Sequence, residues 1–472
     1  MKTISLVEVG GWKLGTYANH SALDPLGLEY IAASAKKEGH NVNVLQQRHQ
    51  SREVLLEEIL FDDPDIVGFS ANFTCNIPDT LDVAQKIKQY KPKTITVFGG
   101  WHASAAPEEL ALEEAVDYVI MGEGEETFVD LLRSLENDAP KDIRGLAYKE
   151  DGKVRTNGRR FADNLDTLPF PLRKKEHLES NVLVPGFPAP SKQRAVAQIA
   201  YSRGCPFVCT YCTAPTIYEG KTHFRSAPNV VDEIEFLQRE FGTNYLFFTD
   251  NTFNFNKKKV LELCDEIRRR GVNINWFAMC RPNPDEEVFT AMRDAGCSRV
   301  AFGVEALTEP LLEDLDRRHS AAQIRESISI VDRLGMIARG YIITSIPGEE
   351  RFYHSPDHYL QDGIKTLKEL ASLGLDSIKV SIMTPLPGTK DYWQHRDKIF
   401  SSDYRLYDTE HPVMMLDHLT PEDSIRIRNT LHLEFYRSKE YQKHIQHKVR
   451  RFSHLRKTFD EHKAWLTERG VY

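Results

Sequence analysis

Two blocks of alternating strand-like and helix-like segments limit the folds open to this 472-residue chain. In the first block, which ends near residue 135, short apolar runs are separated by amphipathic stretches such as 26–38 and 78–90. The predicted strands are 4–9, 41–45, 65–70, 94–98 and 118–121. Strands that alternate with helices form parallel sheets, so this block predicts a doubly wound, Rossmann-like α/β domain. Its ligands should bind beyond the carboxyl ends of the strands.

The second block begins near residue 194 and repeats the alternation. Its predicted strands are 195–202, 245–249, 274–279, 299–304, 338–344 and 377–383. Six strand–helix units predict a partial (β/α)6 barrel of the TIM type. The active site of such a barrel lies at the carboxyl ends of its strands. We therefore expect the residues that follow each strand to carry the chemistry.

The chain is too long for one hydrophobic core and divides into four predicted regions. Residues 1–138 form the first domain and residues 194–397 form the barrel. Between them, residues 139–193 contain a predicted hairpin near 145–153 followed by several prolines, which indicates an ordered linker. Residues 398–472 are helical and rich in aromatic and basic residues. We expect this last region to cover the barrel and shape the substrate pocket.

Three cysteines, Cys205, Cys209 and Cys212, follow the first strand of the second block in a C-x3-C-x2-C pattern. Three such thiolates can hold a [4Fe-4S] cluster and leave one iron open as a reaction site. A structural zinc site is a weaker interpretation, because it needs four ligands and only His223 lies nearby. A disulfide is weaker still, because the chain has seven cysteines and no recognisable secretory signal. These features predict a reducing, cytoplasmic location.

The other cysteines are scattered singly, which argues against an auxiliary cluster. They are Cys75, Cys264, Cys280 and Cys297. We interpret them as small buried hydrophobic residues. Cys280 is the exception to note, because its place at the end of a predicted strand could face the substrate cavity.

The cysteine stretch resembles the signature of the radical S-adenosylmethionine (SAM) superfamily, with Tyr211 at the aromatic position before the last cysteine. The resemblance implies that Cys205, Cys209 and Cys212 hold the [4Fe-4S] cluster, that SAM chelates its open iron and that Tyr211 contacts the adenine. It also implies that one electron from the cluster cleaves SAM to methionine and a 5'-deoxyadenosyl radical. The protein then supplies placement and exclusion of water.

Three further strand-end residues are SAM contacts by the same resemblance. Asp250 lies in the loop that touches the methionine part of SAM, and Glu305 contacts its polar groups. Arg318 matches a basic position that can meet the SAM carboxylate, a charge-complementary pairing. Asp250 could instead cap the next helix, and Arg318 could belong to a solvated salt-bridge network.

Small residues follow the strands of the first block, where a large flat ligand could approach the backbone. They are Ser70, Thr74, Gly99, Gly100 and Gly122. Each glycine alone could simply make a tight turn. Together they resemble the cobalamin-binding domain of the vitamin B12-dependent branch of the radical SAM superfamily. The resemblance implies that Ser70 and Thr74 lie near the nucleotide tail of cobalamin and that Gly99 and Gly100 lie against it.

One departure concerns the lower ligand of cobalt. Cobalamin domains of the methionine synthase type carry D-x-H-x-x-G after the first strand, and this chain lacks that motif. His20 lies in the corresponding loop, but a lone loop histidine is more often a surface residue than a ligand. Two alternatives stay open: a cobalamin without a histidine below it, which is common in this branch, or a vestigial domain that binds none.

The resemblance therefore implies a cobalamin-dependent radical SAM enzyme, most simply a methyltransferase that moves a methyl group through methylcobalamin to an unactivated carbon of a small molecule. A flavodoxin or ferredoxin would supply electrons. Radical cyclases and ring-contracting enzymes of the same branch are the alternative within catalysis, and a cobalamin or Fe-S sensor is the alternative outside it. A net charge of -8 gives no reason to expect nucleic acid, and no uninterrupted apolar run could span a bilayer.

Overall fold

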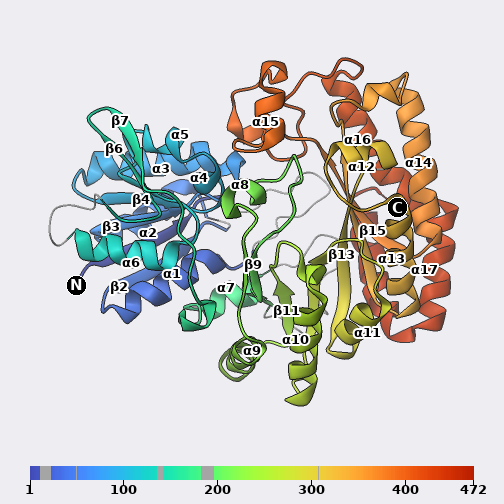
Figure 1. Cartoon of the computed structure of the whole chain (residues 1–472), viewed down its shortest axis with the longest axis horizontal. Coiled ribbons are helices and arrows are strands. Elements are labelled where there is room, and N and C mark those ends of the chain that lie inside the picture. Colours follow the sequence, from blue (N-terminus) through green and yellow to red (C-terminus); the bar gives the residue numbers. More distant parts are fainter. Residues whose placement is uncertain (11–22, 49, 136–141, 182–195, 307, 472) are drawn as a thin grey trace.

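Two lobes, each built on a parallel sheet, lie side by side with the C-terminal helices on the far side of the second (Figure 1). The structure is a computed structural model that describes all residues except 11–22, 49, 136–141, 182–195, 307 and 472. Within the described residues, no helix has the length and apolar character needed to cross a membrane.

The first lobe contains a seven-stranded sheet in the order β2-β1-β3-β4-β5-β6-β7. The strands are β1 (Thr3–Glu8), β2 (Asn41–Gln46), β3 (Ile66–Ser70), β4 (Ile95–Gly99), β5 (Tyr118–Ile120), β6 (Leu146–Glu150) and β7 (Lys153–Thr156). The first five are parallel, which confirms the predicted doubly wound sheet. The hairpin predicted in the linker, β6–β7, joins the same sheet antiparallel to β5. The sheet thus extends past residue 138.

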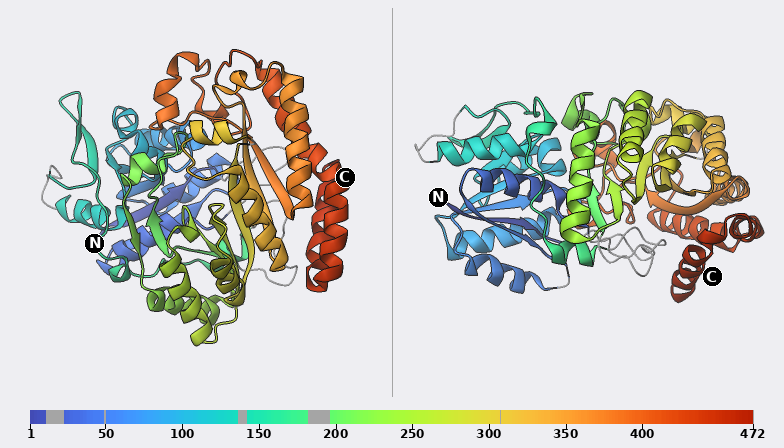
Figure 2. Two further views of the ribbon diagram at one scale, coloured as in Figure 1. Left: turned by 45° about the vertical axis from the view of Figure 1, so that its right-hand side comes forward. Right: turned by 90° about the horizontal axis from the view of Figure 1, so that it is seen from below.

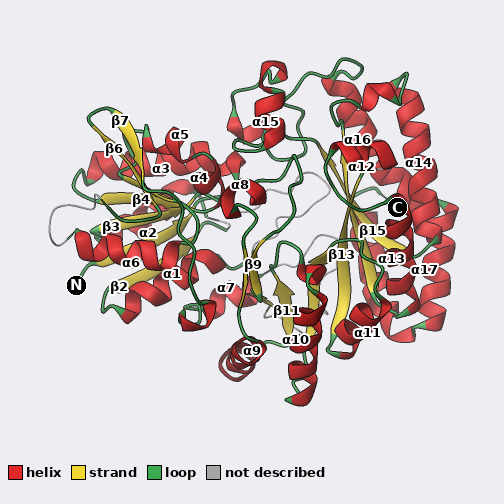
Figure 3. Cartoon of the chain, in the orientation of Figure 1, coloured by secondary structure: helices red, strands yellow, loops and turns green. Residues whose placement is uncertain are grey.

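Helices cover both faces of this sheet (Figure 3). They are α1 (Leu26–Lys37), α2 (Arg52–Phe61), α3 (Ile77–Tyr90), α4 (Trp101–Ala105), α5 (Pro107–Ala111) and α6 (Gly124–Ser134). On one face, apolar residues of α1 and α6 pack against Ile4 and Leu6 of β1. On the other face, α2, α3 and α5 pack against Val7 and Phe69. The alternation of side chains along each strand supplies both apolar faces.

The second lobe is a six-stranded, fully parallel sheet in the order β15-β14-β13-β12-β11-β8. The strands are β8 (Val196–Ile199), β11 (Tyr245–Phe248), β12 (Asn275–Cys280), β13 (Cys297–Glu305), β14 (Ile337–Thr344) and β15 (Leu375–Ile382). The helices between them are α9 (Ala227–Phe241), α10 (Lys257–Arg269), α11 (Glu286–Asp294), α12 (Glu309–Asp314), α13 (Ala321–Arg333) and α14 (Pro356–Ser372). This is the predicted partial barrel.

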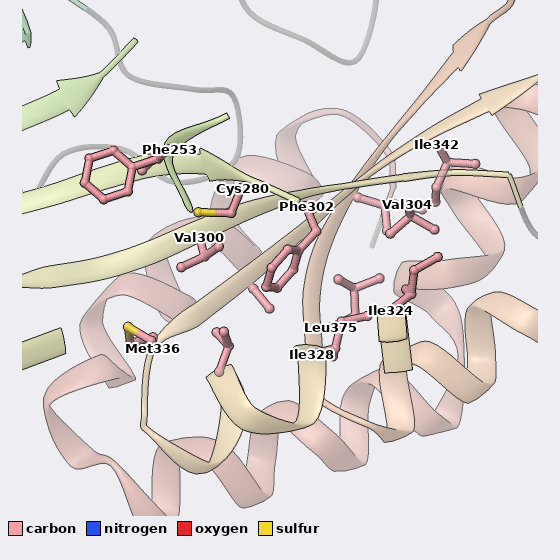
Figure 4. Packing of buried hydrophobic residues seen from close by; sticks show 14 of the residues in the cluster. Phe253, Cys280, Val300, Phe302, Val304, Ile324, Ile328, Met336, Ile342 and Leu375 are labelled. Atoms are coloured by element: carbon pink, nitrogen blue, oxygen red, sulfur yellow. The ribbon is translucent and has the colours of Figure 1, made fainter. Parts of the chain in front are cut away.

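The main core lies between the outer face of this sheet and its helices. Val300, Phe302 and Val304 of β13 pack there with Ile324 and Ile328 of α13 (Figure 4). Cys280 belongs to the same cluster. Cys280 also lines the cavity at the carboxyl ends of the strands, which is the position that the sequence suggested for it.

The C-terminal helices cover the β15 side of the barrel (Figure 2). They are α16 (Pro421–Arg437), α17 (Lys439–Arg451) and α18 (Arg456–Glu468). Asp376 of β15 anchors α17, because its carboxylate is 2.6 Å from Nζ of Lys448 and 2.9 Å from Nε2 of His444. Burial alone would raise the pKa of Asp376, but these two side chains hold it below its usual range. The helical region thus docks through a buried ion pair.

A buried ion network joins the two lobes. Arg173, which follows the first sheet in sequence, binds Asp24 and also lies 2.8 Å from Glu29 of α1. Its other nitrogen is 3.1 Å from Glu233 of α9. The four side chains are at most 1% exposed. Charges desolvated to this degree are stable only in mutual contact, so the network fixes the lobes against each other.

Candidate functional site

The cysteine loop lies between two short antiparallel strands, β9 (Ser202–Gly204) and β10 (Thr222–Phe224). The sequence predicted one strand over 195–202, but the structure ends β8 at Ile199 and begins β9 at Ser202. Asp250 holds this turn, because its carboxylate accepts hydrogen bonds from the backbone N–H groups of Tyr201 and Ser202 at 3.2 and 2.6 Å. Burial raises the pKa of Asp250 to about 6.

Asp250 therefore fixes the backbone turn that precedes the cysteine loop. Its neighbours Asn251 and Thr252 line the cavity beside the cysteines. The predicted contact of Asp250 with SAM thus differs from the geometry, because both carboxylate oxygens are used by the chain itself. Asp250 does not cap the next helix, which was the other alternative, because Asn256 is the N-cap of α10 and Asp250 binds N–H groups that precede it in sequence.

The three cysteines line a cavity of about 150 Å³ at the carboxyl ends of the barrel strands. Among the described residues, no three His, Cys, Asp or Glu side chains converge closely enough to hold a single metal ion. Three thiols around one cavity can supply the three thiolate ligands of a [4Fe-4S] cluster and leave one iron open toward the cavity. The residues present therefore fit a [4Fe-4S] cluster.

Arg317 occupies the place in the cavity that the sequence assigned to Arg318. Its Nη1 donates to the Tyr211 hydroxyl at 3.0 Å and to Sγ of Cys209 at 3.4 Å. Nη2 lies 3.5 Å from Glu305. Burial raises the pKa of Glu305, and the guanidinium opposes that rise. Glu305 and Tyr211 thus line the same cavity as the cysteines.

Arg318 points out of the cavity. Its side chain is 60% exposed and pairs with Asp316 at 3.0 Å. Asp316 and Arg318 both adopt left-handed backbone conformations, with φ of 51° and 52°. These two conformations direct the Arg317 side chain into the cavity and the Arg318 side chain to solvent. The arginine in the cavity is therefore one residue before the arginine that the sequence predicted.

A second buried arginine approaches the same cysteine. Nη1 of Arg281 is 3.9 Å from Sγ of Cys209, and its guanidinium lies 3.7 Å from the ring centroid of Phe207. Nη2 is 3.3 Å from Nδ1 of His319, whose pKa burial lowers to about 3. Arg281 directly follows β12, so it is one of the polar residues that the strand ends bring to the cavity.

The predicted cobalamin residues lie at the carboxyl edge of the first sheet. Gly100 has φ of 111°, and a Cβ there would meet Asn72. The amide of Asn72 donates to the Ser70 hydroxyl at 2.9 Å, and its oxygen accepts from the Trp101 N–H at 3.1 Å. Gly122 has φ of 85°. Both glycines thus hold backbone conformations that favour glycine, and at Gly99 the nearest heavy atom to an added Cβ would be 3.8 Å away.

Thr74 shares a buried hydrogen bond with His102, whose Nδ1 is 3.1 Å from the Thr74 hydroxyl. Burial lowers the pKa of His102 to about 4, so the imidazole is neutral at neutral pH. Its Nε2 is buried and has no hydrogen-bond partner among the described residues. A neutral, unsatisfied nitrogen at this edge fits a polar ligand tail. His20, the candidate lower ligand of cobalt, lies outside the described residues.

This edge faces the cysteine loop. Helix α4 follows β4, and α8 (Ala214–Tyr218) follows the cysteines. The Trp101 and Tyr218 rings of these helices meet edge to face with centroids 5.9 Å apart. Gly388, in the loop after β15, packs so closely on α4 that a Cβ would meet the backbone of Ala105. A ligand on the first sheet would therefore lie over the mouth of the barrel.

Comparisons with known proteins agree with this arrangement. The B12 binding domain family matches residues 20–132, and the Radical SAM superfamily matches residues 199–352. An uncharacterized methyltransferase of Pyrococcus horikoshii is 31% identical over 429 residues, which is 87% of each chain. The hopanoid C-3 methylase of Methylococcus capsulatus is 27% identical over 411 residues, or 83% of this chain and 72% of that protein.

A solved structure shares the fold. The radical SAM methyltransferase TsrM of Kitasatospora setae, with tryptophan and a SAM analogue bound, aligns at a TM-score of 0.67 and 18% identity over 84% of this chain and 76% of TsrM. The two matching domains, in the same order as the two lobes, and the relative at 31% identity show that this chain belongs to the cobalamin-dependent radical SAM enzymes, the family that includes these methyltransferases.

Proposed function

We propose that this protein transfers a methyl group from SAM to an unactivated carbon of a small-molecule substrate. The contact of α4 with α8 carries the proposal, because it brings the ligand edge of the first sheet over the cysteine cavity. Methyl transfer of this kind requires the methyl carrier and the radical source to reach the same substrate in one cavity. The hopanoid methylase among the relatives, named for methylation at carbon, supports the same reaction class.

In this proposal the chain holds the cluster and SAM through the cavity residues. Cys205, Cys209 and Cys212 are the thiolate ligands of the [4Fe-4S] cluster. Arg317 is the charge partner of the SAM carboxylate, and Glu305 is the partner of its amino group or ribose. Tyr211, fixed by its hydrogen bond from Arg317, orients the adenine.

The cobalamin would lie along the carboxyl edge of the first sheet. Ser70 and Thr74 flank the nucleotide tail, with His102 as an additional polar partner. Gly99, Gly100 and Gly122 allow the ligand to approach the backbone. The buried contacts between the lobes exclude water from the space between the two cofactors.

The stoichiometry follows from the reaction class. When bound, the cluster supplies the electron that cleaves SAM, and the cobalamin carries the methyl group. Each turnover consumes two SAM molecules and two electrons, and it yields methylated product, S-adenosylhomocysteine, methionine and 5'-deoxyadenosine. A flavodoxin or ferredoxin is the proposed electron donor.

The test is anaerobic reconstitution with iron, sulfide, cobalamin and a chemical reductant, followed by incubation with trideuteromethyl-SAM and metabolite extract of the source organism. We expect a product that carries the label, together with 5'-deoxyadenosine. Deoxyadenosine without a labelled product would contradict methyl transfer and favour cyclase-type radical chemistry. Failure to cleave SAM at all would contradict both and favour a sensor.

A further inference from the structure

Arg203, two residues before the first cluster cysteine in sequence, binds the first lobe. Its Nη2 is 2.6 Å from Oε1 of Glu125, and its Nη1 is 3.7 Å from Oε2 of Glu123. The guanidinium also lies 5.0 Å from the ring centroid of Tyr30 in α1. The Arg203 side chain is 14% exposed, and the two carboxylates are 5% and 6% exposed.

Glu123 contacts both strands that flank the cysteine loop. Arg203 of β9 is paired in register with His223 of β10. Nε2 of His223 lies 3.2 Å from Oε1 of Glu123, while Oε2 of Glu123 accepts from the Ala162 N–H at 2.6 Å. Although burial opposes ionisation, His223 and Arg203 hold the pKa of Glu123 below its usual range. Glu123 is thus a fixed anion between the lobes.

Glu123 lies in the loop that forms the predicted cobalamin edge, and Glu125 lies in the first turn of α6 that follows it. Glu123 directly follows Gly122, whose N–H donates to the Ser104 hydroxyl of α4 at 3.0 Å. Gly204 separates Arg203 from Cys205, and a Cβ on Gly204 would meet the backbone of Lys221, so the hairpin has no room to shift there. Few covalent bonds therefore separate this ion pair from Cys205 on one side and from the cobalamin edge on the other.

We propose that Arg203 and its partners Glu123 and Glu125 are positioning residues that set the distance between the cluster and the corrin. The inference rests on the proposed function, since it requires both cofactors to be bound. The contact of Arg203 with two buried carboxylates is rigid, because breaking it would leave uncompensated buried charge. Arg203 itself touches neither cofactor in this scheme.

The test compares reconstituted holoenzymes of the wild type, Arg203→Lys and the double variant Arg203→Met/Glu125→Leu. Lysine keeps the charge but cannot reach both carboxylates in the geometry of a guanidinium. The double variant removes the pair between Arg203 and Glu125 together, and it leaves Glu123 with His223 as its partner. Arg405→Gln is the control, because Arg405 also pairs across the lobes, 3.3 Å from Asp79, but is 55% exposed. Cofactor content per chain, 5'-deoxyadenosine formation and the magnetic interaction between reduced cluster and Co(II) cobalamin are measured for each.

We expect cofactor content and 5'-deoxyadenosine formation to stay within about twofold of wild type in both Arg203 variants. The magnetic interaction should weaken or broaden in both variants and stay unchanged in the control. Unchanged interaction in both variants, or its absence in the wild type, would overturn the proposal. So would a loss of cofactor binding that parallels the loss of interaction, since that indicates a structural role only. Because this readout needs no substrate, the failure of methyl transfer would be seen separately.

Discussion

Arg317 donates a hydrogen bond from Nη1 to Sγ of Cys209 across 3.4 Å, although 108 residues separate them in sequence. Hydrogen bonds to cluster sulfurs are among the factors that set the reduction potential of an Fe-S centre. A donor stabilises the more negative, reduced state, so it raises the potential.

We expect Arg317→Gln to lower the potential of the reconstituted cluster by roughly 60 mV, which corresponds to a tenfold change in a one-electron equilibrium. SAM affinity should also fall, because the charge partner of its carboxylate is lost. Potentiometric titration followed by EPR measures the first effect. Arg318→Gln is the matched control, since that side chain is exposed. An equal shift in both variants would contradict the assignment of Arg317.

Gly303→Ala should weaken SAM binding without loss of the fold. A Cβ at Gly303 would meet the Glu305 carboxylate, and it would lie 2.6 Å from Nη2 of Arg317. Both groups are ends of side chains and can move, so the pocket would be disordered while the strand survives. We expect SAM affinity to fall about tenfold, or about 1.4 kcal/mol. Gly27→Ala, with no heavy atom within 4 Å, serves as the control, and equilibrium dialysis with the cluster-loaded protein checks the result.

Gly99→Ala separates cobalamin binding from protein stability. The nearest heavy atom to a Cβ at Gly99 is 3.8 Å away in Ile120, so the protein itself has room for the methyl group. If the tail of cobalamin lies against Gly99, the added carbon occupies its place. We expect normal thermal unfolding of the apoprotein and at least about a tenfold loss of cobalamin affinity by the same steric argument. Wild-type affinity in this variant would show that the ligand does not contact Gly99.

The buried carboxyl of Asp250 should make stability depend on pH. Its pKa is raised by burial from 3.8 to about 6, so the folded state holds the proton more tightly than the unfolded state does. The stabilisation by this group is full below about pH 4 and is lost as pH rises through about 6. At about 1.4 kcal/mol per pKa unit, the change is roughly 3 kcal/mol.

Asp250→Asn removes that dependence. The unfolding free energy of the wild type minus that of the variant should therefore be smaller at pH 7 than at pH 4. Urea unfolding of both proteins across this range measures it. A constant difference would show that Asp250 does not change its protonation between the folded and unfolded states.

The strand pattern was sufficient to predict both sheets, because each buried parallel strand leaves a run of apolar residues. The pattern failed at Tyr201, where one continuous run covers the end of β8 and the start of β9. The break depends on Asp250, 48 residues from Ser202, and local sequence carries no signal of that contact.

The lack of a local signal also explains why the sequence pointed to Arg318 and not to Arg317. Two adjacent basic residues, Arg317 and Arg318, differ in sequence only by position, and the left-handed turns at Asp316 and Arg318 decide which one enters the cavity. Those turns use residues other than glycine, so the usual signal of a positive φ is missing. The three cysteines, by contrast, are recognisable because their spacing alone brings them to one cavity.

The Arg173 network has a consequence for the order in which the chain is made. Asp24 and Glu29 emerge from the ribosome long before Arg173, and Glu233 emerges later still. Domains generally fold in sequence from the N-terminus during synthesis. The first sheet can therefore assemble early, but the interface that orients it is complete only after α9 has been synthesised. Until then the two lobes of the nascent chain have no fixed mutual orientation.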